Sequence, residues 1–275
     1  MVESSLKPNF IAKIWQEWQA AMMFLTILPA LPAPKEKIGL HQCFWAFPII
    51  GALLGFIMAG FIYVALYYLY LPSLVALSIA FAIYYILTGA LHEDGLADIC
   101  DGAAARGDIK KRRAIMRDSQ LGSFGVIGLI LAIITKIALY DYLLFKYSYY
   151  FLMLMVMATM LARAIVPFAL TFFPSQDTKS GAYMPAIGKT QLGFVVMIML
   201  IPMIYYLPFI LLMAVLAANI FLLLAFGYWA RWRLQGMSGD ACGALIVLSE
   251  IVTLIGLTAA FNISIFNINL GGILG

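Results

Sequence analysis

Charged residues are scarce in this chain. Asp, Glu, Lys and Arg together make up 11% of the 275 residues, whereas hydrophobic residues make up 64%. Because soluble domains contain about 25% charged residues, this composition argues against a water-soluble protein. The apolar runs also lack the alternation of apolar and polar residues that is typical of membrane β-strands. The sequence therefore predicts an all-α fold, a polytopic helical membrane protein.

The cysteine and histidine patterns of a metal or redox centre are absent too. The chain has three cysteines, and none lies in a Cys-x-x-Cys pair or at the spacing of a metal site. The two histidines, His41 and His92, are too far apart in sequence to form a recognisable pair. These residues indicate no thiolate or paired-histidine metal centre.

Seven apolar segments are long enough to cross a bilayer, which takes about 20 residues per helix. They lie at roughly 44–70, 72–91, 121–143, 149–173, 191–207, 208–229 and 243–262. We find no internal repeat and no soluble domain, so residues 1–275 are expected to form a single integral membrane domain.

Residues 8–32 precede these segments and have two interpretations. They are either a first, kinked membrane helix or a helix that lies in the membrane interface. The tryptophans Trp15 and Trp18 and the charges of Lys13 and Glu17 fit the interfacial alternative slightly better.

The basic residues predict how the chain is oriented in the membrane. Threading the seven segments back and forth places residues 1–41, 92–120, 174–190 and 230–242 on one face. These four stretches hold all the Lys and Arg residues except Lys136, Lys146 and Arg163. Such a bias marks the cytoplasmic side. We therefore expect a multi-pass protein of the cell (inner) membrane, with one site assembled from several cytoplasmic loops.

The most informative motif is the acidic stretch at residues 93–101. Asp94, Asp98 and Asp101 stand at i, i+4 and i+7, so in a helix they share one face. Carboxylates that lie so close repel one another, and a hard cation such as Mg²⁺ neutralises them. The simpler interpretation is helix-end charge, because acids stabilise a helix N-terminus by about a few tenths of a kcal/mol each. Glu93 is held as a possible further metal ligand.

Basic residues follow the acidic motif at once. Arg106, Lys111 and Arg117 are candidates for contacts with phosphate groups. They also serve as part of the positive-inside signal, and the two roles are compatible. Asp118 comes directly after them and is a candidate to complete a metal shell or to act as a base.

Four other ionisable residues lie in or beside apolar segments. Placing a charge at the bilayer centre costs roughly 2.5–3.5 kcal/mol on insertion scales, so such residues are functional by default. Arg163 is placed to meet a phosphate or a carboxylate, with Glu250 as its candidate partner. Lys136 either has a function or extends toward an interface. Asp240 either caps a helix or contacts substrate.

Two family resemblances follow from these motifs. Asp98-x-x-Asp101-Gly102-x-x-Ala105-Arg106 resembles the opening of the CDP-alcohol phosphotransferase signature, but Ile115 stands where that signature has its next glycine. The longer block from His92 to Gly125 closely resembles the cobalamin synthase family, the adenosylcobinamide-GDP ribazoletransferases. The resemblance continues at Phe24-Leu25-Thr26, Phe47-Pro48, Lys136, Arg163, Gly239-Asp240 and Glu250.

The resemblance implies a Mg²⁺-dependent transfer of adenosylcobinamide-phosphate from adenosylcobinamide-GDP to alpha-ribazole or its 5′-phosphate, with release of GMP. It implies that Asp94, Asp98 and Asp101 hold metal beside the diphosphate. Arg163 and Asp240 are expected to contact substrate, with the phosphate candidates named above. The expected partners are these substrates and the lipid bilayer, with no nucleic acid. A homo-oligomer or a biosynthetic complex is left open.

Two other functions compete with this interpretation. One is a CDP-alcohol-type phosphotransferase that acts on a lipid. The other is an ion-coupled transporter whose pathway is formed by Lys136, Arg163 and Glu250. A transporter requires its carboxylates near mid-bilayer, whereas an enzyme that uses soluble nucleotides requires them at the membrane surface.

Overall fold

The computed structural model describes residues 10–29, 39–118, 120–146, 150–175 and 188–274. Helices account for nearly all of them, and the described residues contain no β-strand, only one isolated bridge between Pro174 and Met237. The helices are α1 (Phe10–Leu25), α2 (Leu40–Cys43), the 3-10 turn η1 (Phe44–Ala46), α3 (Phe47–Tyr67), α4 (Ser73–Thr88), α5 (Leu91–Ala104), α6 (Ile109–Met116), α7 (Ser123–Lys146), α8 (Phe151–Phe172), α9 (Lys189–Tyr206), α10 (Phe209–Leu234) and α11 (Gly239–Leu274). The predicted all-α fold is confirmed.

The long helices have the dimensions of membrane spans. Within the described ranges, six helical segments are long and apolar enough to cross a bilayer, and they include α3, α7, α8, α9, α10 and the first part of α11. The pair α4 and α5 passes the same test together, although the two helices are bent by 88° relative to each other. Counting this pair gives seven spans, as the apolar segments predicted.

The second predicted span is wrong in one respect, because 72–91 is not a continuous helix. The α4 helix ends at Thr88, and both Gly89 (φ 63°) and Ala90 (φ 50°) adopt the left-handed conformation. A left-handed residue ends a right-handed helix, and two in succession redirect the chain. The acidic helix α5 therefore starts a new direction instead of continuing α4.

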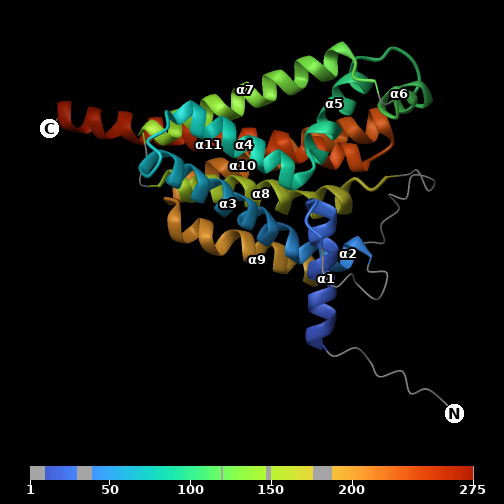
Figure 1. Ribbon diagram of the computed structural model, residues 1–275, viewed down its shortest axis with the longest axis horizontal. Helices are drawn as coiled ribbons and strands as arrows, with labels where there is room; N and C mark the ends of the chain where they lie inside the picture. Colours follow the sequence, from blue (N-terminus) through green and yellow to red (C-terminus); the bar gives the residue numbers. More distant parts are fainter. Residues whose placement is uncertain (1–9, 30–38, 119, 147–149, 176–187, 275) are drawn as a thin grey trace.

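The N-terminal helix α1 runs across the ends of the long helices rather than alongside them (Figure 1). It is not among the helices long and apolar enough to span a membrane. Its outer half exposes Phe10, Ile11 and Trp15, whereas Leu25 at its inner end is fully buried. This arrangement favours the interfacial helix over the kinked span.

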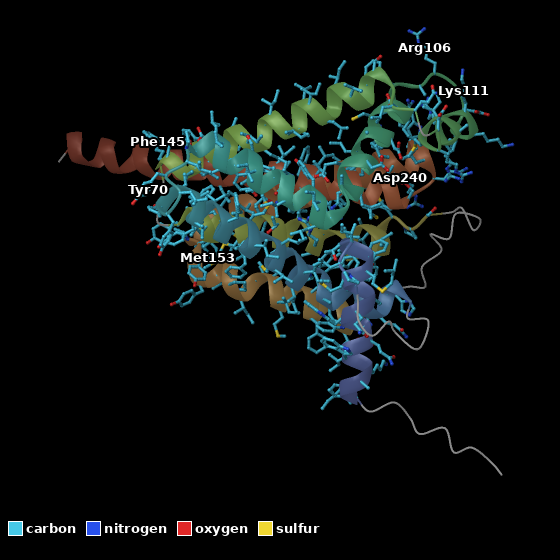
Figure 2. The ribbon with its side chains drawn as sticks, viewed as in Figure 1. Tyr70, Arg106, Lys111, Phe145, Met153 and Asp240 are labelled. Carbon is cyan, nitrogen blue, oxygen red and sulfur yellow. The ribbon has the colours of Figure 1, made fainter. Side chains whose placement is uncertain are left out.

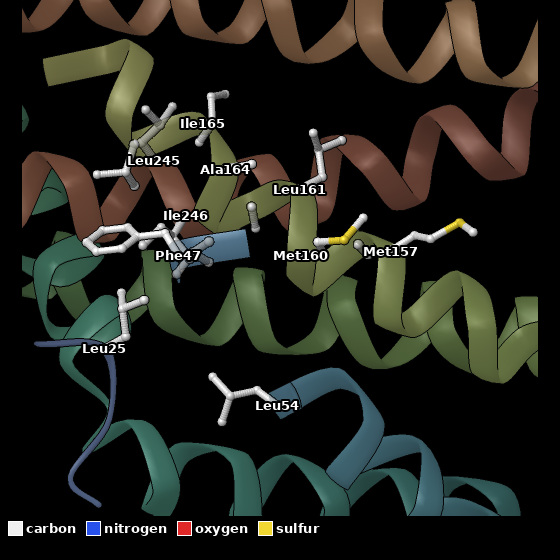
Figure 3. Close-up of a cluster of buried hydrophobic side chains, with 14 of the residues drawn as sticks. Leu25, Phe47, Leu54, Met157, Met160, Leu161, Ala164, Ile165, Leu245 and Ile246 are labelled. Carbon is white, nitrogen blue, oxygen red and sulfur yellow. The ribbon is translucent and has the colours of Figure 1, made fainter. Parts of the chain in front are cut away.

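The core is built around α8, most of whose residues are buried. The α3 helix packs against it at two glycines. A Cβ atom on Gly51 would lie 2.9 Å from the Cα of Met160, and one on Gly55 would lie 2.7 Å from the Cα of Val156. Small residues allow such close approach between membrane helices. Figure 3 shows the resulting cluster, in which side chains of α8 meet Phe47 and Leu54 of α3 and Leu245 and Ile246 of α11.

The α3–α8 contact gives a first prediction. Gly55→Ala inserts a methyl group against the backbone of Val156, and overpacking of this kind costs typically 1–3 kcal/mol. We expect a lower thermal unfolding temperature in detergent. Gly60→Ala on the same helix is the control, since its Cβ would meet nothing within 4 Å. Equal unfolding temperatures for the two variants would contradict the close packing of α3 on α8.

Candidate active site

Polar residues from distant parts of the chain gather at one end of the helix bundle. Arg106, Lys111 and Asp240 all lie at this end, whereas Tyr70, Phe145 and Met153 lie at or toward the opposite end (Figure 2). The residues of this polar end come from α5, α6 and the start of α11. The polar end therefore brings together two of the four stretches that the basic residues assigned to one face, 92–120 and 230–242.

The α5 helix carries the three aspartates on its outer face. It spans Leu91–Ala104, so Asp94, Asp98 and Asp101 share one side of a regular helix, as their spacing predicted. Asp94 is exposed, and Asp98 and Asp101 are half-buried. His92 and Glu93, by contrast, are buried on the inner side.

Glycines bring α5 and α11 into very close contact. A Cβ atom on Gly95 would lie 2.7 Å from the backbone oxygen of Asp240, and one on Gly243 would lie 3.1 Å from the Cα of His92. This crossing places Asp240 beside the aspartates of α5. More than a hundred positions separate these residues in the sequence, and the sequence analysis did not predict their contact.

The carboxylates of this site act on one another electrostatically. The negative charges of Asp240, Asp94 and Asp101 all disfavour a negative charge on Asp98. The cationic side chain of Arg117 in turn acts on Asp240. The site thus concentrates negative charge around Asp98, with a basic residue at its edge.

Asp101 also has a structural role that the sequence did not suggest. Its Oδ2 accepts a hydrogen bond from the backbone N–H of Gly122, and its Oδ1 accepts one from that of Gly125, both at 2.8 Å. These amides lie at the N-terminal end of α7, where unpaired N–H groups and the helix dipole favour a negative charge. Asp101 therefore fastens α5 to the start of α7. Each of its oxygens keeps a second lone pair for another partner.

Asp118 and Asp101 line the same cavity of about 380 Å³. The Oδ1 of Asp118 accepts a hydrogen bond from the backbone N–H of Gln120. The cavity is lined by polar and apolar residues, namely Asp101, Ala104, Ala105, Ile115, Asp118, Gln120, Leu121, Gly122 and Phe124. The structure thus brings together two aspartates that lie on either side of the basic segment.

The carboxylate oxygens of this site suit a hard cation, although they do not form a complete ligand shell. Carboxylate oxygens are the ligands that Mg²⁺ takes in proteins, and a cation beside Asp98 would relieve the repulsion described above. Among the residues that the structure describes, no group of three His, Cys, Asp or Glu side chains converges to hold a metal ion. The carboxylate oxygens match Mg²⁺ in their chemistry, but the described side chains do not by themselves form a site for it.

The basic helix α6 has two kinds of cationic residue. Arg112 donates to the backbone oxygen of Gly107 and Arg113 to that of Leu234, so both hold the polar end together. The phosphate candidates Arg106, Lys111 and Arg117 are exposed. Asp108 caps α6 by accepting a hydrogen bond from the backbone N–H of Lys111. The polar end therefore exposes basic side chains on α6 and on the segments that flank it.

The buried ionisable residues pair differently from the prediction. Glu250 forms an ion pair with Lys136, with its Oε2 3.0 Å from Nζ, so its proposed pairing with Arg163 is wrong. Arg163 instead donates to the hydroxyl of Tyr84 and to the backbone oxygen of Thr159. Lys136 is 1% exposed, which rules out extension to an interface. Glu93 also faces Lys136, on the side of α5 away from the aspartates.

Comparison with known proteins assigns this chain to a family. A family model described as cobalamin-5-phosphate synthase matches residues 17–258. The chain belongs to the cobalamin-5-phosphate synthase family. The matched range includes every site residue discussed above, from Glu93 to Glu250.

Curated relatives of the cobalamin-5-phosphate synthase family cover most of the chain. An adenosylcobinamide-GDP ribazoletransferase of Geotalea daltonii is 34% identical over 245 residues, which is 87% of this chain and 95% of the relative. Those of Desulforamulus reducens and Syntrophobacter fumaroxidans are 33% and 31% identical, over 82% and 90% of this chain and 89% and 98% of the relatives. No solved structure matches the chain.

The role of Asp101 in holding α7 gives a second prediction for this family member. Asp101→Ala removes the acceptor of two backbone N–H groups, and a hydrogen bond to a charged group contributes about 1.5–3 kcal/mol. We expect a lower unfolding temperature in detergent. Asp98→Ala is the matched control, because losing its charge only relieves repulsion. A loss of stability as large in Asp98→Ala as in Asp101→Ala would be evidence against the anchoring role.

Proposed function

We propose that this chain is an adenosylcobinamide-GDP ribazoletransferase. The proposal rests on its family membership and on relatives of that name that match it along nearly their whole length. One structural observation carries it furthest: the aspartate face of α5 lies at the polar end of the bundle, where a soluble nucleotide-linked substrate has access.

The reaction is a displacement at phosphorus. A ribose hydroxyl oxygen of alpha-ribazole, or of its 5′-phosphate, forms a bond to the phosphorus that is attached to the corrinoid. The bond from that phosphorus to the bridging oxygen of the diphosphate breaks, and GMP leaves with the bond's electron pair. The hydroxyl proton passes to a base or to water. Adenosylcobalamin, or its phosphate, results.

The residues of the polar end divide into two roles. Asp94, Asp98, Asp101 and Asp118 would supply carboxylate oxygens to hold a Mg²⁺ ion, and the ion would supply positive charge beside the diphosphate. Arg106, Lys111 and Arg117 hold phosphate groups through charge-assisted hydrogen bonds. Asp240 contacts substrate from the start of α11, and Asp118 is also placed to take the hydroxyl proton. We propose that Arg163 acts behind this layer, through Tyr84, because it is fully buried.

We further propose that the polar end faces the cytoplasm of the cell and that the protein resides in the inner membrane. The bias of Lys and Arg residues supports this orientation. The substrates carry a nucleotide or a nucleoside, and these are found in the cytoplasm.

The rival functions have less support. A lipid phosphotransferase would share the metal motif, but the relatives that match this chain bear the name of the corrinoid enzyme. A transporter requires a pathway through the intramembrane charges. Lys136 and Glu250 instead form a closed ion pair packed among buried side chains.

The proposed activity gives a third prediction. Membranes that contain the protein, supplied with adenosylcobinamide-GDP, alpha-ribazole and Mg²⁺, should produce GMP and adenosylcobalamin in equal amounts. Chelation of the metal with EDTA should stop the reaction, and added Mg²⁺ should restore it. Chromatography of both products measures the outcome. Well-folded protein without turnover would refute the proposed function, and turnover in EDTA would refute the metal.

Asp98 is the residue on which activity should depend most. Asp98→Asn keeps the size of the side chain and removes the charge that lies at the centre of the acidic site. We expect activity to fall by at least about 100-fold, as is typical when a group that stabilises charge in a transition state is lost. Expression and unfolding temperature should stay near those of the wild type. Near-normal turnover would remove Asp98 from the metal site.

A further inference from the structure

A cluster of charged side chains lies inside the bundle, behind the aspartate face. Lys136 of α7 lies 3.0 Å from a carboxylate oxygen of Glu250 on α11 and 3.7 Å from one of Glu93 on α5. Tyr140 donates a hydrogen bond to the other oxygen of Glu250. The rings of Phe81, Tyr84 and Tyr85 surround the ammonium group, with centroids 5.0–5.6 Å from it.

Stability alone is a weak reason for such a cluster. Burying an ion pair costs several kcal/mol of desolvation per ion, and well-packed apolar residues in its place are often equally stabilising or better. What an ion pair does provide is a fixed geometry, because only one arrangement satisfies the buried charges. Two carboxylates from different helices share the one ammonium of Lys136, so α5 and α11 are each held against α7.

The α5 helix begins at a sharp turn of the chain, which does not by itself fix how the helix is rotated about its axis. It starts directly after two left-handed residues, and its first turn has no side-chain cap. Glycines form its contact with α11 at Gly95 and Gly243. Glycines permit close approach but offer no side chain that would resist rotation of the helix. The hydrogen bonds of Asp101 to Gly122 and Gly125 constrain the C-terminal half of α5. The rotation of its first turn, which carries Asp94, must be set by other contacts.

Glu93 is placed to set this orientation. Successive residues of a helix are rotated by about 100°, since there are 3.6 residues per turn. Glu93 and Asp94 are adjacent, and the first is buried beside Lys136 while the second is exposed. Holding Glu93 inward therefore holds Asp94, and with it Asp98 one turn later, on the outer face.

We propose that Glu93 is a positioning residue of the transferase, and that its ion pair with Lys136 aims Asp94 and Asp98 at the metal and diphosphate. This inference rests on the proposed function. It assigns Glu93 a place behind the metal site, and the opposite assignment, Glu93 as a metal ligand, makes different predictions.

A charge swap separates the two assignments. In Glu93→Lys the ammonium groups at 93 and 136 repel each other. In the double variant Glu93→Lys/Lys136→Glu, one ammonium again lies between two carboxylates, now those at 136 and 250, and the net charge is that of the wild type. If Glu93 positions the helix, the swap restores Mn²⁺ binding and activity. If Glu93 is a metal ligand, the swap does not restore them, because position 93 then carries a cation.

Two readouts are measured on purified, folded protein in detergent. The first is the binding of Mn²⁺ in the absence of substrates, followed by electron paramagnetic resonance. The second is kcat and KM for the corrinoid substrate. We expect Glu93→Gln to weaken Mn²⁺ binding and lower kcat by about 10-fold each, with KM nearly unchanged, as for other residues that orient metal ligands. The swap should restore both to within about threefold of the wild type.

Asp141→Asn is the matched control, since it neutralises another acid on α7, the helix that carries Lys136. It should leave Mn²⁺ binding and kcat unchanged. Unaltered Mn²⁺ binding in Glu93→Gln would overturn the inference. So would a swapped protein that folds but binds Mn²⁺ no better than Glu93→Gln. If wild-type protein binds Mn²⁺ but makes no cobalamin, the proposed function fails while the positioning role is still decided by the binding data.

Discussion

The contact between α5 and α11 is the constraint on which the functional end of this protein depends. Two glycines, Gly95 and Gly243, let the helix backbones approach to a distance that any side chain would prevent. Because of this approach, Asp240 joins carboxylates that lie more than a hundred residues earlier in the chain. The same contact places His92 and Glu93 in the interior and leaves the aspartates outside. Without it, the acidic motif would be a charged helix beside a membrane bundle and not a composite site.

The membrane makes this arrangement demanding. Charge in a low-dielectric interior has to be paired, and the protein meets this requirement by separating its ionisable groups into two layers. In the inner layer, Lys136 balances Glu250 and Glu93, and Arg163 lies against Tyr84. In the outer layer, at the polar end, the aspartates repel one another and remain open to a cation from solution. The inner layer pairs its charges within the protein, whereas the outer layer is where, under the proposed function, metal and substrate would bind.

The sequence predicted the features that local patterns control. Hydropathy identified the spans, and the spacing of Asp94, Asp98 and Asp101 placed them on one helical face. The sequence did not predict features that depend on contacts between distant segments of the chain. The partner of Glu250 is Lys136 instead of Arg163 because α7, not α8, brings its cation to that carboxylate. The break at Gly89 and Ala90 was missed because an apolar run longer than a helix gives no sign of where the chain turns. The sequence indicated Asp101 only as a candidate metal ligand. Its hydrogen bonds to Gly122 and Gly125 were missed because they depend on the position of α7.

Those two hydrogen bonds explain why the glycines after the basic segment matter to the site. Gly122 and Gly125 expose backbone N–H groups at the start of α7, and a Cβ atom on either would collide with the carboxylate of Asp101. The motif from Asp94 to Gly125 is thus a single structural unit, in which the acids and the glycines require each other. The aspartates supply the charge, and the glycines make room for it. A change of spacing at either end of this unit would move Asp101 away from its partners.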